Sequence, residues 1–378
     1  TSIAGNIAIQ GDDIIDLTPL STLLSVGGYL YVGGYPIGNA SLTNLDGLNN
    51  LTSVGGSLYV SFNALLINLD GLGNLTSVGY FLEVNGNNAL TNLDGLGNLT
   101  SMISGELSVY ENPALTNLNG LSNISSVGGG LRVSDNASLT NLDGLSNISS
   151  VGDHLEVNGN NAFTNLDGLI NLTSVGDYLY VNGNASLTNL DGLSNLTSVG
   201  GGLMVSDNAS LTNLDGLNNL TSVGGDLEVE RNHSLNNFCG LYPLLSSNGL
   251  QGSYTVSGNL LNPTQQQIND DGPCVTTALA ENELLPKDYT LHQNYPNPFN
   301  PSTTISYELP EQSIVSLTVY DVQGREIVTL QNGGILPGNY EVQWSGIDES
   351  GNPVSTGVYF CRLVAGSYSK TIKMVYLR

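Results

Sequence analysis

The chain has 378 residues, with 33 acidic and 8 basic side chains and a formal net charge of −25 at pH 7. Before residue 275 its only basic side chains are Arg132 and Arg231, which excludes nucleic acid as a partner because phosphate neutralisation needs clustered Lys and Arg. A surface this acidic is also repelled by anionic lipid, and no apolar run approaches the ~20 residues of a membrane span.

A repeat occupies most of the chain. The segment SLTNLDGLNNLTSVGGSLYV, residues 41–60, returns with little change until about residue 230. Each copy, hereafter a rung, cannot bury its apolar side chains alone, so neighbouring rungs must stack. Together with degenerate copies at both ends, the repeat predicts an all-β fold over residues 1–262: a parallel right-handed β-solenoid of about ten 24-residue rungs. One aliphatic column recurs every 24 residues, apart from a first step of 28 and one step of 25: Val26, Val54, Val78, Met102, Val127, Val151, Val175, Val199 and Val223.

The aliphatic spacing changes within a rung. The last pair alternates with outward residues as in a strand, whereas the earlier spacing of three fits neither a strand nor an amphipathic helix, and it predicts corners of the coil. Stacked rungs would pair as parallel strands ~4.8 Å apart. In one copy the positions are Leu66, Leu69, Leu72, Leu75, Val78, Leu82 and Val84.

Three Asn columns accompany the aliphatic frame. Asn has both a donor and an acceptor, so a stacked Asn can satisfy backbone groups freed where the coil bends. The columns are represented by Asn63 and Asn136, by Asn98 and Asn147, and by Asn92 and Asn141.

An Asp column, each member followed by Gly, has two interpretations. One is a carboxylate ladder for calcium; the other is a turn in which Asp bonds the local backbone and Gly takes a positive φ. Asn119 and Cys239 interrupt the column, and because Asn119 keeps the acceptor oxygen but loses the charge, the turn is favoured. We therefore predict no metal site and no cofactor. The column consists of Asp46, Asp70, Asp94, Asp143, Asp167, Asp191 and Asp215.

The frame LTSVGGxLxVxxNxxLTNL, as at residues 196–214, resembles the receptor L domain. This is the leucine-rich-repeat-like β-helix of growth-factor receptor ectodomains and some fungal wall proteins. The resemblance covers roughly residues 5–262 and implies the fold while saying little about a ligand. The chain departs from the receptors in having more rungs, greater uniformity and almost no cysteines.

A cap and linker are predicted at residues 263–288. Pro263 and Thr264, followed by residues 265–268, indicate a short helix over the last rung with Pro in its first turn. Cys239 and Cys274 bracket this segment, so they either form a bridge that clamps the cap or remain free thiols. Residues 275–288 have the composition of a linker. Cys361 is expected to be a lone, partly buried thiol.

A second domain is predicted at residues 289–378. The repeat is absent there, and short alternating strands at 316–320, 340–344, 358–363 and 371–376 are separated by Gly, Pro and Asn turns. About 90 residues of this pattern indicate an immunoglobulin-like β-sandwich. Six of the eight basic residues lie in or next to it: Lys287, Arg325, Arg362, Lys370, Lys373 and Arg378.

Several motifs of this domain resemble the C-terminal sorting domain of type IX secretion cargo. They are LHQNYPNPFNP at 291–301, TTI at 303–305, GRE at 324–326 and GVYF at 357–360. The family belongs to the Bacteroidetes and related phyla, and its fold is similar to the Ig-like domain of the flagellar hook-capping protein. Over residues 286–378 the resemblance implies the type IX secretion machinery as a partner and an extracellular or cell-surface location.

The outward positions of the predicted strands vary from rung to rung, which makes them candidates for a binding surface. Aromatic members can stack on sugar rings or anchor a protein partner; the alternative is a solvated sheet in which Tyr simply favours strands. The candidate residues are Tyr31, Tyr59, Phe81, Arg132, His154, Tyr178 and Tyr180.

Catalysis has little support in the sequence. Only Arg132 near Glu156 could begin a site of the polysaccharide-lyase kind, His154, His233 and His292 are scattered, and the Thr columns are single, unlike those of ice-binding solenoids. We therefore expect that the protein is not an enzyme. The expected function is adhesion or ligand binding, with a surface glycan or protein as the ligand. The alternative is a structural subunit of an extracellular filament or surface layer, with copies of itself as partners and the Ig-like domain retained.

Overall fold

The computed structural model describes residues 1–35, 38–102, 105–274, 286, 288–310, 313–335 and 338–377. The chain divides into two compact units, Thr1–Cys274 and Val275–Arg378. Most of the predicted linker, 275–285 and 287, lies outside the described residues. Among the described residues, no helix has the length and apolar character needed to cross a membrane.

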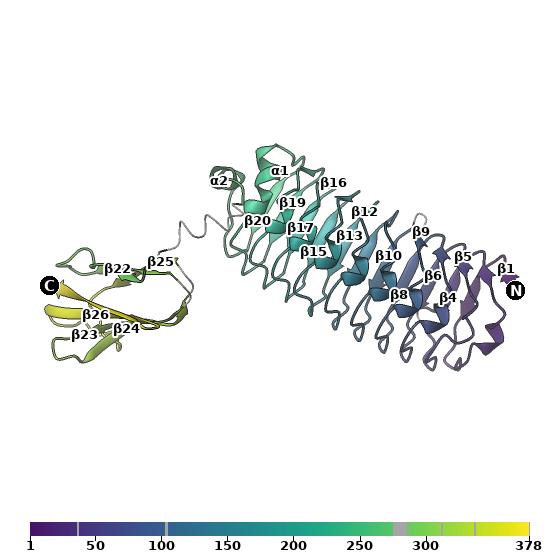
Figure 1. The fold of residues 1–378 in the computed structure, drawn as a ribbon, viewed down its shortest axis with the longest axis horizontal. Coiled ribbons are helices and arrows are strands. Elements are labelled where there is room, and N and C mark those ends of the chain that lie inside the picture. The colour runs from purple at the N-terminus through teal and green to yellow at the C-terminus, as the bar shows by residue number, and fades with distance from the viewer. Residues whose placement is uncertain are drawn as a thin grey trace. The chain divides into compact units, whose positions relative to one another are not determined.

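Eleven parallel strands stack rung upon rung into one sheet, hereafter the long sheet (Figure 1). Each strand pairs in register with the same positions of the next rung, as in the series Tyr31, Tyr59 and Glu83. The predicted parallel β-solenoid with a 24-residue period is confirmed. In order the strands are β2 (Ile7–Ile9), β4 (Leu30–Gly33), β6 (Leu58–Ser61), β8 (Leu82–Asn85), β10 (Leu107–Tyr110), β11 (Leu131–Ser134), β13 (Leu155–Asn158), β15 (Leu179–Asn182), β17 (Leu203–Ser206), β19 (Leu227–Glu230) and β20 (Tyr254–Ser257).

Two-residue strands form two shorter parallel sheets within the same rungs. The first contains β1 (Ser2–Ile3), β3 (Ser25–Val26), β5 (Ser53–Val54), β7 (Ser77–Val78) and β9 (Ser101–Met102). The second contains β12 (Ser150–Val151), β14 (Ser174–Val175), β16 (Ser198–Val199) and β18 (Ser222–Val223). The break between them falls at the 25-residue step of the repeat, where Val127 forms only an isolated bridge with Val151.

The predicted corners are 3-10 helices. Three residues per turn place every third side chain on one face, so Leu69, Leu72 and Leu75 are all fully buried. The helices are η1 (Thr18–Leu20), η2 (Asp70–Leu72), η3 (Asp94–Leu96), η4 (Asn119–Leu121), η5 (Asp143–Leu145), η6 (Asp167–Leu169), η7 (Asp191–Leu193), η8 (Asp215–Leu217) and η9 (Cys239–Leu241).

The Asp-Gly pair begins six of these helices, η2, η3 and η5 to η8, but the predicted reason for it is wrong. The backbone N–H of Asp143 donates to the side chain of Asn141 at 3.1 Å, so Asn makes the local turn bond. Within the Asp-Gly column, Gly47 is the one described glycine with a positive φ, of 108°. Gly144 is needed for another reason, because a Cβ there would lie 1.9 Å from the carbonyl oxygen of Leu118 in the preceding rung.

The predicted backbone role of the Asn columns is confirmed. In the fully buried column, Asn136 accepts from the backbone N–H of Asn112 at 3.1 Å and donates to the carbonyl of Val109 at 2.9 Å. In an exposed column, Asn147 donates to the carbonyl of Ser122 at 2.6 Å. Each amide therefore links one rung to the rung before it.

The C-terminal end of the solenoid is covered by α1 (Tyr242–Ser246) and α2 (Gln265–Asp271) (Figure 1). Ile268 of α2 is buried in the solenoid core. Thr264 is the N-cap of α2 in a capping box with Gln267, so Pro263 precedes the helix and the prediction of Pro in the first turn is wrong. Cys239 and Cys274 form a disulfide.

The second unit is a sandwich of two antiparallel sheets, as predicted. One contains β21 (Thr290–Leu291), β22 (Thr303–Leu309) and β25 (Gly338–Trp344). The other contains β24 (Glu326–Ile335), β23 (Ser313–Tyr320), β26 (Gly357–Ala365) and β27 (Tyr368–Tyr376). Cys361 is fully buried at an inward position of β26, not partly buried as predicted, and this burial raises its pKa to about 12.

Candidate functional site

The outward face of the long sheet carries the predicted binding residues. The register of the strands lines up their second positions, so that Tyr31, Tyr59, Glu83, Ser108, Arg132, Glu156, Tyr180, Met204 and Glu228 form one continuous column. The seven predicted residues do not form one site, because they divide between two aromatic clusters with Arg132 between them.

The first cluster lies on the rungs of β4, β6 and β8. The rings of Tyr31 and Tyr59 stack in parallel, with centroids 4.6 Å apart and an interplanar angle of 4°. Phe81 and Tyr59 line a small cavity of about 130 Å³ together with Glu83 and Glu106. Parallel in-register pairing places identical positions side by side, which is why Tyr stacks on Tyr here.

The second cluster lies on the rungs of β13 and β15. The ring of His154 stacks on Tyr178 at 4.9 Å, and Tyr178 stacks on Tyr180 at 4.3 Å. The ring of His154 occupies the space above Gly130, where a Cβ would lie 2.3 Å from it. Burial raises the pKa of Tyr178, and the nearby Tyr180 and acidic groups raise it further.

Arg132 lies between the clusters and is held by the chain itself. Its Nε lies 3.6 Å from a carboxylate oxygen of Glu156 and donates to the Ser134 hydroxyl at 3.1 Å. Its guanidinium carbon lies 4.4 Å from the centroid of the Tyr110 ring. Through these contacts Arg132 connects its own rung, that of β11, with the rungs of β10 and β13.

A larger cavity of about 390 Å³, hereafter the hollow, opens on the outward face across β4, β6, β8 and β10. Five aromatic rings line it. Two belong to the first cluster, and three are not among the predicted binding residues. The rings are those of Tyr31, Tyr35, Tyr59, Phe62 and Tyr110.

The polar groups of the hollow are acidic or neutral. Glu83 and Glu111 line it, and the Tyr110 hydroxyl donates to Glu83 at 3.0 Å. Burial raises the pKa of Glu83, and the bond from Tyr110 partly offsets that effect. Burial, with the carboxylate of Glu83 adding to it, raises the pKa of Tyr110 to about 12, so this hydroxyl remains a donor at neutral pH.

Next to the hollow, one rung carries a glycine between two larger neighbours. Phe62, Gly86 and Glu111 follow β6, β8 and β10 at the same position of the repeat, and all three have a positive φ, of 58°, 65° and 55°. A Cβ on Gly86 would lie 2.8 Å from the Phe62 ring. The missing side chain at Gly86 thus makes room for that ring.

Asn85 also lines the hollow and is only 2% exposed. Its Oδ1 has no hydrogen-bond partner among the described residues. Elsewhere in the same column such oxygens are paired: Asn158 Oδ1 accepts from Asn182 at 3.3 Å, and Asn182 Oδ1 accepts from Ser206 at 2.8 Å.

Three of the additional residues of the hollow can be recognised in the sequence because they differ from the usual residue of the repeat. Tyr110 stands where most rungs have Ser or Asn, and Phe62 and Glu111 stand where several rungs have Gly. They are departures from the repeat, as the predicted residues are, but they fall in the columns at the end of each strand and just beyond it.

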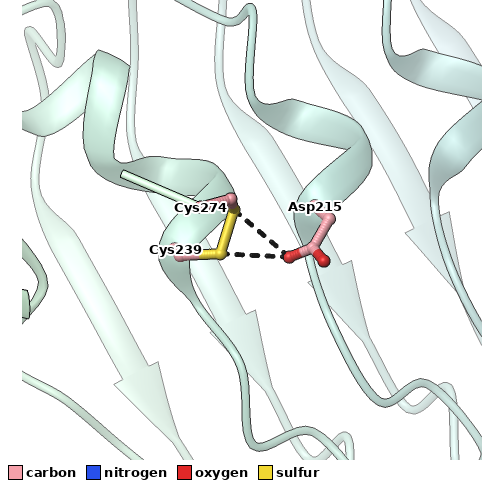
Figure 2. Close-up of side chains that lie close together, drawn as sticks. All are labelled: Asp215, Cys239 and Cys274. Carbon is pink, nitrogen blue, oxygen red and sulfur yellow. Dashed lines mark hydrogen bonds between the residues drawn. A yellow bond between two sulfur atoms is a disulfide. The ribbon is translucent and has the colours of Figure 1, made fainter. Parts of the chain in front are cut away.

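One further cluster gathers groups that often bind metals. Figure 2 shows the Cys239–Cys274 disulfide beside Asp215. The two sulfur atoms lie 3.1 and 3.3 Å from one carboxylate oxygen of Asp215. Disulfide sulfurs carry neither a proton nor a negative charge, so these are van der Waals contacts and the oxidised pair supplies no thiolate ligand. The amide of Asn237 donates to the same oxygen at 3.1 Å.

The motif at residues 291–301 of the second unit has a structural role. Asn294 donates to the Thr303 hydroxyl at 2.8 Å, and Asn297 accepts from the backbone N–H of Val375 at 2.8 Å. The Phe299 ring is buried against Trp344 and Tyr376. The motif therefore ties the start of this unit to its last strand.

The C-terminal unit is similar to a known protein family. Residues 298–369 match the FlgD Ig-like domain. No curated protein matches the chain.

Proposed function

We propose that this chain is a secreted, surface-displayed protein that binds a glycan or protein ligand on the outward face of its long sheet. The observation that carries the proposal is the contrast between the two faces of each strand. Inward positions repeat Leu and Val, fully buried, whereas outward positions change from rung to rung and gather aromatic rings at the hollow and at the second cluster.

Export rests on the second unit. The match to an FlgD Ig-like domain and the motifs at 291–301, 324–326 and 357–360 support a sorting domain of type IX secretion cargo, which would place the solenoid outside the cell. The finer assignment of the solenoid as a receptor L domain rests on the repeat frame. Binding is favoured over catalysis because Arg132 is engaged by Tyr110, Ser134 and Glu156.

The experiment is a screen of the purified full chain on glycan and surface-protein arrays, followed by variants. We expect the double variant Tyr31→Ala, Tyr59→Ala to lose at least tenfold in affinity for the ligand found, because buried aromatic contacts dominate such interfaces. The control is Ile67→Ala, which removes an exposed side chain outside the sheet face. The absence of any ligand, together with concentration-dependent assembly of the chain, would instead support the filament subunit.

A further inference from the structure

We propose that the hollow binds an N–H-bearing organic cation, that is, a protonated amine or a guanidinium. The inference rests on the proposed function in one respect, since it takes the outward face of the long sheet as the binding face. It adds the chemical class of the ligand, which we derive from three features of the hollow: an unpaired acceptor, two carboxylates and five aromatic rings.

The unpaired acceptor requires a ligand that donates. Asn85 Oδ1 is buried and has no partner among the described residues, whereas the amide oxygens of Asn158 and Asn182 in the same column are paired. The cause lies in the next rung, where Tyr110 replaces the usual Ser or Asn and directs its hydroxyl to Glu83. A buried acceptor left unpaired is unfavourable, so a ligand that brings a donor to it is favoured over one that does not.

The carboxylates require that the donor be positively charged. Glu83 and Glu111 line the hollow from neighbouring rungs. The nearby cation, Arg132, is held against the Tyr110 ring and Glu156. Burial of Glu83 strengthens its attraction for a cation, because a desolvated charge interacts through a lower effective dielectric. An anionic ligand would be repelled by both groups.

The rings supply the third part of the recognition. An ammonium or guanidinium over an aromatic face is attracted by the negative face of the ring, and more strongly where water is excluded. The chain already uses this interaction once, with Arg132 over Tyr110 at 4.4 Å. A neutral sugar could stack on Tyr31 or Tyr59, but it would leave the two carboxylates uncompensated.

The test is a calorimetric titration of the full chain with three cations and their neutral counterparts at low ionic strength. The cations are Nα-acetyl-lysine amide, Nα-acetyl-arginine amide and glucosamine. Their neutral counterparts are, in the same order, Nα-acetyl-norleucine amide, Nα-acetyl-citrulline amide and N-acetylglucosamine. We expect at least one cation to bind tenfold more tightly than its counterpart, and the tightest identifies an amine, a guanidinium or an amino sugar as the source.

The variants assign the binding to the hollow. Glu83→Gln and Glu111→Gln should each weaken it at least fivefold, whereas Glu228→Gln, in the same outward column but outside the hollow, should leave it unchanged. Circular dichroism establishes that each variant is folded. Equal affinity for cations and neutral counterparts, or no effect of either hollow variant, overturns the inference. A ligand found on the arrays that depends on Tyr31 and Tyr59 would then still support the proposed function. If a cation bound in the hollow but the arrays gave no ligand, the cation site would be supported and the proposed function would not.

Discussion

Among single residues, the buried Asn column is expected to contribute more to stability than any exposed polar column. Asn136→Ala removes the acceptor for the backbone N–H of Asn112 and the donor to the carbonyl of Val109, both inside the solenoid. Two buried backbone groups lose their partners, so we expect a loss of about 3 kcal/mol in the free energy of unfolding. Urea denaturation followed by circular dichroism measures it.

Asn147→Ala is the matched control. Its amide also bonds a carbonyl of the preceding rung, that of Ser122, but at an exposed position where water can replace it. We expect a loss below about 1 kcal/mol. If the two variants were equally destabilising, burial of the first column would not be the reason for its Asn.

For some residues the sequence predicts the position but not the physical reason for the residue type. The positions of Asp143 and Gly144 in a turn follow from the repeat. The reason for the glycine does not, because the obstructing carbonyl belongs to Leu118 on another rung. The hollow is similar: Phe62, Tyr110 and Glu111 each look like a single departure from the repeat, and only the stacking of β6, β8 and β10 brings them together around a cavity.

Among the elements, the strands were the most predictable because the inward Leu and Val positions fix the register of every rung. In the second unit, alternation located β23, β25, β26 and β27 but not their full lengths. The division of the short strands into two sheets could not be predicted, since the strand positions on both sides of the break follow the same repeat.

The cap is the element whose stability is most easily tested. The disulfide closes a separation of 35 residues, between η9 and the residue that follows the cap, and a constraint of that length contributes about 4 kcal/mol on chain-entropy grounds. Cys239→Ser with Cys274→Ser should therefore lower the melting temperature. Reductant should lower that of the parent chain and leave the variant unchanged; an equal response of both would contradict a role of this bond.

For the whole molecule, the acidic charge of the solenoid agrees with the proposed cationic ligand. Residues before 275 carry two basic side chains, Arg132 and Arg231, and both are held in ion pairs with the chain's own carboxylates. The solenoid is thus strongly acidic, and its field attracts cationic partners over distances that salt shortens to about 8 Å at physiological ionic strength. A cation site in the hollow would make local use of that field.

We propose that the ligand binds on the outward face of the long sheet, at the hollow. Hydrogen exchange of the full chain, measured by mass spectrometry with and without the ligand found on the arrays, locates the bound surface. We expect slower exchange in residues 30–35, 58–62, 82–86 and 107–111, on β4, β6, β8 and β10 and the residues just after them. Slower exchange confined to the cap at 265–271 or to residues 288–377 would contradict it.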